Sequence, residues 1–217
     1  MTKGKRIKNM NKRDIKLISN LKNISQNQKL MNSIILIQNN INIYANSKII
    51  ALSSARDDIS LCAVAHAMAE VYAIQNQSTL LIDCNMYNPL LNKMFHKENN
   101  VIGLDNIIDE KINTEKLINH ISNNLDIVFA NKTCYPTIVF KSKQYYDFID
   151  NAKNEYDHII LVMPSLIEHQ DILISKDLIN AVLLIARKNK VSKKDLFDAI
   201  NTVKTNNLPY VGVIYLK

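Results

Sequence analysis

Residues 48–75 read KIIALSSARDDISLCAVAHAMAEVYAIQ and carry the pattern that decides the fold. The apolar run at 48–53 has the length of a buried strand, and the alanine-rich stretch at 60–75 has the length and composition of a helix. Ser60 stands at the start of that stretch and is predicted to cap it. The sequence therefore predicts a strand, a short polar turn and a helix in direct succession.

The same alternation continues along the rest of the chain. Further apolar runs of strand length lie at residues 78–83, 125–130, 158–163, 180–187 and 210–216. Helices are predicted between them, at residues 89–96, 103–120, 136–156, 170–178 and 192–206. Strands that are apolar almost throughout and alternate with helices indicate an α/β fold, with a mostly parallel sheet and helices on both faces. Ligands of such sheets bind beyond the carboxyl ends of the strands, at residues 54–62, 83–88, 130–136 and 162–168 here.

The amino-terminal part has a different character. Residues 1–45 are predicted to form a basic helical segment outside the sheet, with an amphipathic stretch at 12–22 and a helix at 28–44, and residues 46–217 form the α/β domain. Much of the net charge of +7 comes from one cluster of basic residues: Lys3, Lys5, Arg6, Lys8, Lys12, Arg13 and Lys16. This cluster has two interpretations, a solvated tail or a segment attracted to an anionic membrane surface. Nucleic acid is not expected as a partner, because no aromatic side chains are interleaved with these charges.

Length and composition limit the remaining classes of protein. At 217 residues the chain is long enough for one α/β domain, and no apolar run reaches the roughly 20 residues that span a bilayer. The three cysteines and five histidines are scattered and match no metal-binding spacing. We therefore expect a cytoplasmic protein without a metal site, either free or at the inner face of the cell membrane.

The turn after the first strand stands where a phosphate-binding loop would be expected. Such loops use glycines so that backbone N–H groups can wrap the phosphates, a lysine that reaches the β- and γ-phosphates, and a hydroxyl that holds Mg²⁺. The turn in this chain contains no glycine and no lysine, and two aspartates lie where a triphosphate would bind. The residues of this degenerate phosphate loop are Arg56, Asp57, Asp58, Ile59, Ser60, Leu61 and Cys62.

Residues 80–83 (LLID), 88–95 (NPLLNKMF) and 156–164 (YDHIILVMP) belong to a series of short motifs in residues 48–217. This series resembles the cytoplasmic tyrosine-kinase domain of bacterial capsule and exopolysaccharide synthesis, a relative of the MinD/ParA ATPases. Residues 80–83 (LLID) and 88–95 (NPLLNKMF) are similar to that family's LLIDxDxRxPxLHKLF. Residues 156–164 (YDHIILVMP) are similar to its YDYVIIDTPP. Shorter similarities follow the same order at residues 48–55, 103–104, 125–127, 135–137 and 187–196. The resemblance implies a P-loop NTPase-like sheet.

The departures from that family fall on its functional positions. Leu61, Cys62 and Ala63 stand where the family has a lysine and two hydroxyl residues. Asp83 is retained, whereas Asn85 replaces a second aspartate. Tyr87 replaces an arginine, Val162 replaces the aspartate beside Mg²⁺, and Asp171 matches a later aspartate. We therefore read Asp83, Asn85, Val162 and Asp171 as a vestigial site.

Two further features of the resembling kinases are not found in this sequence. Their ring-forming ExxRxxR motif aligns with Asn32, Ile35 and Gln38, which carry no charge. Their carboxyl-terminal tyrosine cluster has no counterpart before Lys217.

The resemblance and its departures together predict a pseudokinase-like protein without catalytic residues or cofactor, which acts on a membrane adaptor of polysaccharide chain-length control or on an active paralogue. One alternative is a residually active kinase or ATPase that uses ATP and Mg²⁺. Another alternative is a MinD/ParA-like positioning protein.

Several single residues have two interpretations each. Asp83 is a metal ligand or a residue that caps a loop, and Cys62 is a reactive thiol or a small packed residue. His66 is predicted to lie in the core or just behind the site. Tyr145 and Tyr146 are phosphorylation sites or the aromatic side of an amphipathic helix. Arg56, Asp57 and Asp58 pair with a partner protein or face water.

Overall fold

The computed structural model describes residues 24–44, 48–95 and 101–217, together with residues 14, 16, 19 and 21. The basic residues before residue 14 and most of the stretch 12–22 lie outside the described residues. The strands are β1 (Ile49–Ser54), β2 (Thr79–Asp83), β3 (Ile118–Ser122), β4 (Leu125–Val128), β5 (His158–Val162), β6 (Ala181–Arg187) and β7 (Tyr210–Leu216). The α-helices are α2 (Gln28–Tyr44), α3 (Ile59–Ile74), α4 (Leu90–Met94), α5 (Pro136–Lys141), α6 (Lys143–Glu155) and α7 (Lys193–Thr205).

The seven strands form one sheet in the order β3-β4-β2-β5-β1-β6-β7. All neighbouring strands are parallel except the β3–β4 pair, which is antiparallel. The α/β fold with a mostly parallel sheet is therefore confirmed. Since β1 lies between β5 and β6, and β2 lies next to β5, the loops that follow these four strands meet at one edge of the sheet.

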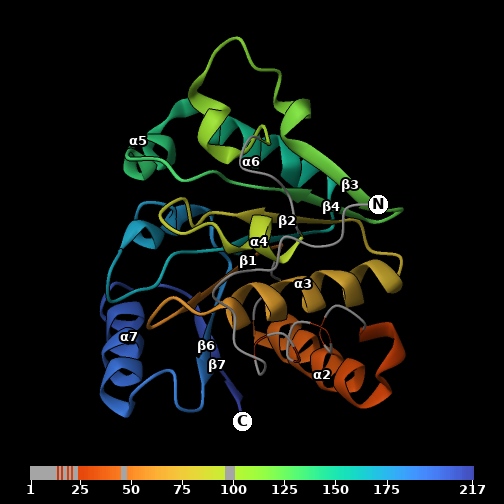
Figure 1. Ribbon diagram of the computed structural model, residues 1–217, viewed down its shortest axis with the longest axis vertical. Helices are drawn as coiled ribbons and strands as arrows, with labels where there is room; N and C mark the ends of the chain where they lie inside the picture. Colours follow the sequence, from red (N-terminus) through yellow and green to blue (C-terminus); the bar gives the residue numbers. More distant parts are fainter. Residues whose placement is uncertain are drawn as a thin grey trace, which may run out of the picture.

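Side chains alternate between the two faces of the sheet and build a core on each. In β1, Ile49 and Ala51 join the core under α5, α6 and α7, whereas Ile50 and Leu52 join the core under α2, α3 and α4. Figure 1 shows α3 along one side of the sheet with α2 outside it, and α5 and α6 on the other side. The central strands β1, β2 and β5 are thus covered on both faces, which explains why their sequences are apolar almost throughout.

The helix α2 packs on α3 rather than on the sheet. Ile34 and Ile41 of α2 are buried in the same core as α3, and the Gln38 side chain donates a hydrogen bond to the carbonyl of Met68 over 3.0 Å. Leu36 and Ile43 on the outer side of α2 are exposed. A division of the chain near residue 45 stays a prediction.

Three expectations about the elements were wrong. Residues 118–122 form the edge strand β3, whereas a helix was expected there; the half-exposed sequence INHIS has no apolar periodicity, and only the two-residue link to β4 gives a hairpin signal. The expected helix 136–156 is broken at Ser142, whose side chain caps α6 by accepting from Tyr145 N–H. Residues 170–178 form two short 3₁₀ turns, η4 (Asp171–Leu173) and η5 (Lys176–Leu178), instead of one helix.

Candidate functional site

The turn between β1 and α3 ends in a helix cap made by an aspartate. Asp58 is the N-cap of α3, with φ −145° and ψ 135°, and its Oδ1 accepts a hydrogen bond from Ser60 N–H over 2.9 Å. The prediction that Ser60 caps this helix was therefore wrong, because the carboxylate two residues earlier takes the free N–H group. An anion thus already lies at the amino-terminus of α3, where the helix dipole and free N–H groups would otherwise attract a phosphate.

Asp58 also shares a buried guanidinium. Arg187 Nη1, at the end of β6, lies 2.6 Å from Asp14 Oδ1 and 3.3 Å from Asp58 Oδ1. The three side chains are 7 to 11% exposed. Burial alone would lower the pKa of Arg187, but the two carboxylates raise it above its ordinary value. The amino-terminal part of the chain is thus joined to the candidate site through Asp14.

Asp57 points in the other direction, toward the loop after β2. Its Oδ1 accepts from the Asn85 amide and its Oδ2 from the Asn88 amide, each over 3.1 Å. Asn88 in turn accepts from Lys93 Nζ over 2.9 Å. Both carboxylate oxygens of Asp57 are therefore satisfied by neutral donors of the same chain.

Arg56 is the exposed member of the loop. Its Nε and Nη2 contact the two carboxylate oxygens of Asp195 on α7, at 2.9 and 3.3 Å, and its Nη1 lies 3.8 Å from Glu168. Arg56, Asp57 and Asp58 thus pair within the chain. These contacts within the chain were not foreseen, because the partners come from distant parts of the sequence. Arg56 also faces water in part, and a pairing of the three residues with a partner protein stays a prediction.

The residues that replace the lysine and hydroxyl side chains of a phosphate loop are packed in the core. Leu61, Cys62 and Ala63 are each at most 2% exposed, and Ile59 is 8% exposed. Burial and the neighbouring aspartates raise the pKa of the Cys62 thiol well above its ordinary value, which favours the interpretation of a packed residue over a reactive one. These positions therefore offer apolar packing and no side chain for a phosphate.

Asp83 lies fully buried at the end of β2. Its two oxygens accept hydrogen bonds from Asn85 N–H over 3.0 Å and from Leu91 N–H over 3.1 Å. Burial raises the pKa of this carboxyl to about 7, although the two N–H donors act in the opposite direction. These contacts support the interpretation that Asp83 caps the loop from β2 to α4.

Asp83 gives a prediction for the pH dependence of stability. Because its pKa is about 7 in the folded chain and about 4 when unfolded, the folded chain binds one more proton between these values, so its stability falls as pH rises from 4 to 7. The variant Asp83→Asn lacks this dependence but has lost an acceptor for one N–H group. We expect its deficit in urea midpoint to be largest near pH 4 to 5 and to shrink toward pH 8. A deficit that is constant across this pH range would contradict the buried, protonated carboxyl.

The loop after β5 contributes an aromatic and acidic cluster. Val162 ends β5 and is fully buried. Asp171 accepts from the Thr137 hydroxyl over 3.0 Å and forms a hydrogen bond with Tyr87. The Tyr87 ring stacks on His169, with centroids 3.5 Å apart and planes 6° apart. The structure therefore brings Asp171 to Tyr87, and the stacking of Tyr87 on His169 was not foreseen.

The remaining candidates are structural. Tyr145 is fully buried and its hydroxyl lies 3.3 Å from Ser175 Oγ, while the Tyr146 hydroxyl donates to Ile174 O over 2.8 Å. These contacts favour an amphipathic helix over a phosphorylation site. His66 is 6% exposed and its ring meets Phe95 edge to face, so it lies in the core as expected.

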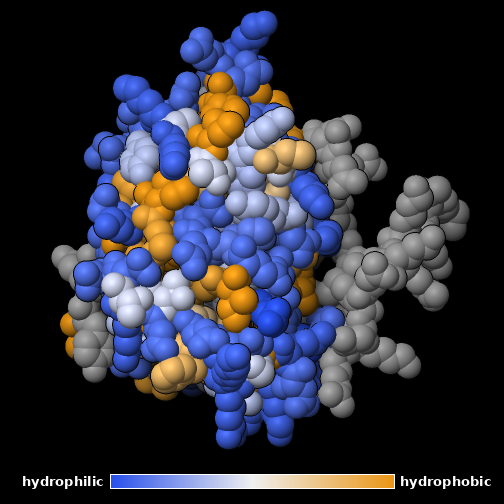
Figure 2. Space-filling model, turned by 90° about the vertical axis from the view of Figure 1, so that its left-hand side faces the viewer, coloured by the Kyte–Doolittle hydropathy of each residue, from blue (hydrophilic) through white to orange (hydrophobic). Residues whose placement is uncertain are grey.

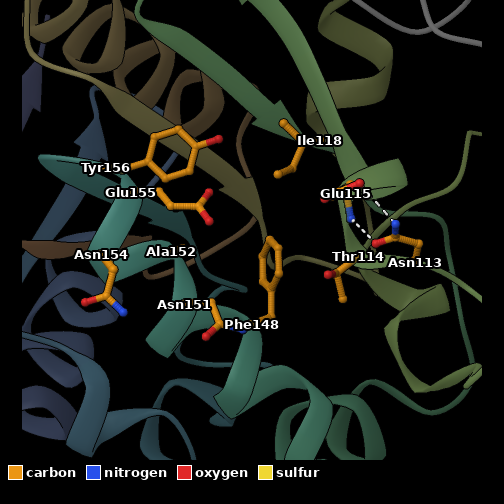
Figure 3. A pocket seen from close by; sticks show the side chains of 10 residues that line it. All are labelled: Asn113, Thr114, Glu115, Ile118, Phe148, Asn151, Ala152, Asn154, Glu155 and Tyr156. Carbon is orange, nitrogen blue, oxygen red and sulfur yellow. Dashed lines mark hydrogen bonds between the residues drawn. The ribbon is translucent and has the colours of Figure 1, made fainter.

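A separate cavity of about 290 Å³ lies between η3 (Thr114–Leu117), β3 and α6. Figure 3 shows Phe148, Ile118 and Tyr156 around it, with Glu115 and Glu155 at its margin. Its lining has no lysine or arginine, which makes it unsuited to phosphate.

Among the described residues, no group of three His, Cys, Asp or Glu side chains could hold a metal ion. In the same part of the chain, no helix is both long enough and apolar enough to cross a membrane.

Comparison with known proteins finds bacterial tyrosine kinases. The chain is 22% identical over 172 residues to the tyrosine-protein kinase ptk of Acinetobacter johnsonii and to the tyrosine-protein kinase CpsD of Streptococcus pneumoniae serotype 4. The matched region covers 78% of this chain, 76% of CpsD, but only 23% of ptk. No protein-family model matches the chain.

Solved structures show the same fold. The kinase domain of the Escherichia coli tyrosine kinase ETK superposes with a TM-score of 0.81 at 17% identity, covering 97% of this chain and 83% of that one. The MinD protein of Pyrococcus horikoshii, solved with Mg-ADP, superposes with a TM-score of 0.62 at 16% identity, covering 77% of this chain and 69% of that one. The resemblance to the bacterial tyrosine kinases of MinD/ParA type is thus confirmed, and so is the P-loop NTPase-like fold.

Proposed function

We propose that this chain is a non-catalytic, pseudokinase-like relative of the capsule and exopolysaccharide tyrosine kinases. One observation carries the proposal: the anion at the amino-terminus of α3 is the carboxylate of Asp58, held by Ser60 N–H and Arg187. A phosphate entering this place would meet a fixed negative charge in a site that is shielded from water. Like charges so close repel strongly when they are poorly solvated.

The neighbouring residues support the same proposal. Phosphoryl transfer depends almost entirely on positioning and charge neutralisation. Leu61 and Ala63 supply neither, because both are packed in the core. Asn85 and Val162 bring no carboxylate to the metal side of the cleft, and Asp57 is held by the amides of two asparagines. The degenerate loop therefore lacks the means to hold ATP or Mg²⁺.

The resemblance also suggests a partner. We infer that the chain regulates or supports a membrane adaptor of polysaccharide chain-length control, or pairs with an active paralogue of the kinase. Its basic segment at residues 1–45 would precede the α/β domain at residues 46–217 and face the inner side of the cell membrane. The proposal requires the framework of the kinases, which the fold provides, and does not require nucleotide.

A binding experiment tests this partnership. The cytoplasmic tail of a chain-length adaptor from the same genome, immobilised as a peptide, is expected to retain the chain, and a scrambled tail is not. Retention is expected to be equal with Mg-ATP and with EDTA, because no nucleotide-dependent state exists. Failure to bind the adaptor tail and an active paralogue alike would contradict the proposal.

Two alternatives predict different results. A residually active kinase or ATPase would produce phosphotyrosine on the chain when ATP is added, and Asp83→Ala would remove it. A MinD/ParA-like positioning protein without a nucleotide switch would bind neither the adaptor tail nor the paralogue. The contacts of Asp58 favour the non-catalytic proposal over the first alternative.

A further inference from the structure

The turn after β6 and the first turn of α7 carry a dense group of lysines. Four lysines within seven residues are exposed: Lys188, Lys190, Lys193 and Lys194. Among the described residues, none of them forms an ion pair. Two acidic side chains of α7 lie close to these lysines: Asp195, whose carboxylate is taken up by Arg56, and the exposed Asp198, so the lysines outnumber the acidic residues. The surface at this end of the domain, called here the lysine surface, therefore keeps its positive charge.

Part of this charge works against the helix that bears it. Ser192 is the N-cap of α7, so Lys193 and Lys194 occupy its first two positions. Cations are unfavourable at a helix amino-terminus, where the macrodipole is positive and Asp or Glu would stabilise the helix. The two lysines therefore do not serve the stability of α7, and the combined field of helix end and lysines attracts an anionic surface.

A large apolar side chain lies on the same face. Phe197 is 62% exposed, three residues after Lys194 and four after Lys193, which places the three side chains side by side on one face of α7. Figure 2 faces the side of the molecule on which α7 lies; its lower part is mostly hydrophilic, with separate hydrophobic spots among the hydrophilic atoms. A phenylalanine beside lysines suits the boundary between lipid headgroups and acyl chains.

We propose that the lysine surface, with Phe197, docks on an anionic lipid bilayer. The lysines would lie at the level of the headgroup phosphates and carboxylates, and the Phe197 ring would enter the apolar boundary below them. This site differs from the basic amino-terminal sequence and does not depend on the proposed function. The two are nevertheless linked, because Asp14 within that sequence contacts Arg187, the residue directly before Lys188.

Sedimentation of the full chain with vesicles tests the proposal. The vesicles contain phosphatidylcholine with phosphatidylserine, or phosphatidylcholine alone. The variant Lys188→Gln/Lys190→Gln/Lys193→Gln/Lys194→Gln is expected to lower the partition coefficient on the anionic vesicles about 600-fold, since each of the four lysines near such a surface contributes about 5-fold. Phe197→Ser is expected to lower it about 10-fold.

A matched control carries the same charge change elsewhere. Four exposed lysines on other elements are replaced by glutamine: Lys111, Lys116, Lys132 and Lys141. In this control the partition coefficient on the anionic vesicles is expected to fall less than about 3-fold, because charges more than a Debye length from the membrane contact are screened. Both variants are expected to keep the thermal midpoint of the parent chain.

Two results would overturn the proposal. Equal small losses in both lysine variants would assign all vesicle binding to the amino-terminal sequence. If the variant of the lysine surface loses binding to polyglutamate, while Phe197→Ser leaves vesicle binding unchanged, the surface belongs to an acidic protein partner instead of a lipid.

Discussion

Calorimetric titration of the chain with Mg-ATP, up to high-micromolar nucleotide, is expected to show no saturable heat of binding. On the proposed function, the physical reason is the combined loss of a lysine, a metal-holding hydroxyl and an acidic metal ligand, with the carboxylate of Asp58 at the amino-terminus of α3. Each missing charged contact corresponds to about 3 kcal/mol, so that two of them remove about four orders of magnitude of affinity. A kinase domain with an intact phosphate loop serves as the positive control, and micromolar binding by this chain would contradict the proposed function.

The variant Asp58→Gly tests the cause of this loss. Removing the carboxylate leaves the amino-terminus of α3, the buried hydroxyl of Ser60 and the guanidinium of Arg187 around an open anion position. We expect inorganic phosphate at tens of millimolar to raise the thermal midpoint of this variant by several degrees and to leave the parent chain unchanged. In a domain of this size, each kcal/mol of stabilisation by a bound ligand typically raises the thermal midpoint by about 2 to 4 °C. No difference between variant and parent would show that Asp58 does not exclude phosphate.

The second large effect concerns Arg187. The variant Arg187→Met leaves the carboxylates of Asp14 and Asp58 buried without their cation, which is expected to lower the free energy of unfolding by about 3 to 5 kcal/mol. The measurement is the urea midpoint at neutral pH. If the single variant does not fold, the triple variant with Asp14→Asn and Asp58→Asn is expected to recover most of the loss, because both charges are then gone.

Arg56→Met is the matched control, since it removes the same type of side chain from the same edge of the sheet. The ion pair of Arg56 with Asp195 is half exposed, so its loss is expected to cost less than about 1 kcal/mol. If Arg187→Met lowers the free energy of unfolding no more than Arg56→Met does, the contact of Arg187 with Asp14 is not maintained in solution.

The strands were predictable because their residues are buried on both faces. The runs that start near Ile49, Leu80 and Ile159 are apolar on both faces, so they are expected at the centre of a covered sheet. The edge strand β3 was missed because one half-exposed strand leaves little apolar signal. The break at Ser142 was missed because one local hydrogen bond from its side chain decides it.

The candidate site, like the fold, could be predicted from the sequence only in part. The interpretation that Leu61 and Ala63 replace a lysine and a hydroxyl residue could be made from residue types alone, because the motif of the resembling kinases is local. The contacts that fill the place could not, because they join residues far apart in the sequence: Arg187 is 173 residues from Asp14 and 129 from Asp58. Pairings of this kind depend on the order of the strands, and sequence periodicity does not give that order.

The internal carboxylate at the start of α3 has a consequence for regulation in the cell. A nucleotide-driven switch needs two conformations and a ligand that favours one of them. A domain that supplies its own anion has no such ligand, so on the proposed function its binding surfaces would be ready as soon as the chain has folded. Its influence on a polysaccharide machine would then follow the number of copies that the cell makes and would be insensitive to the cell's energy charge.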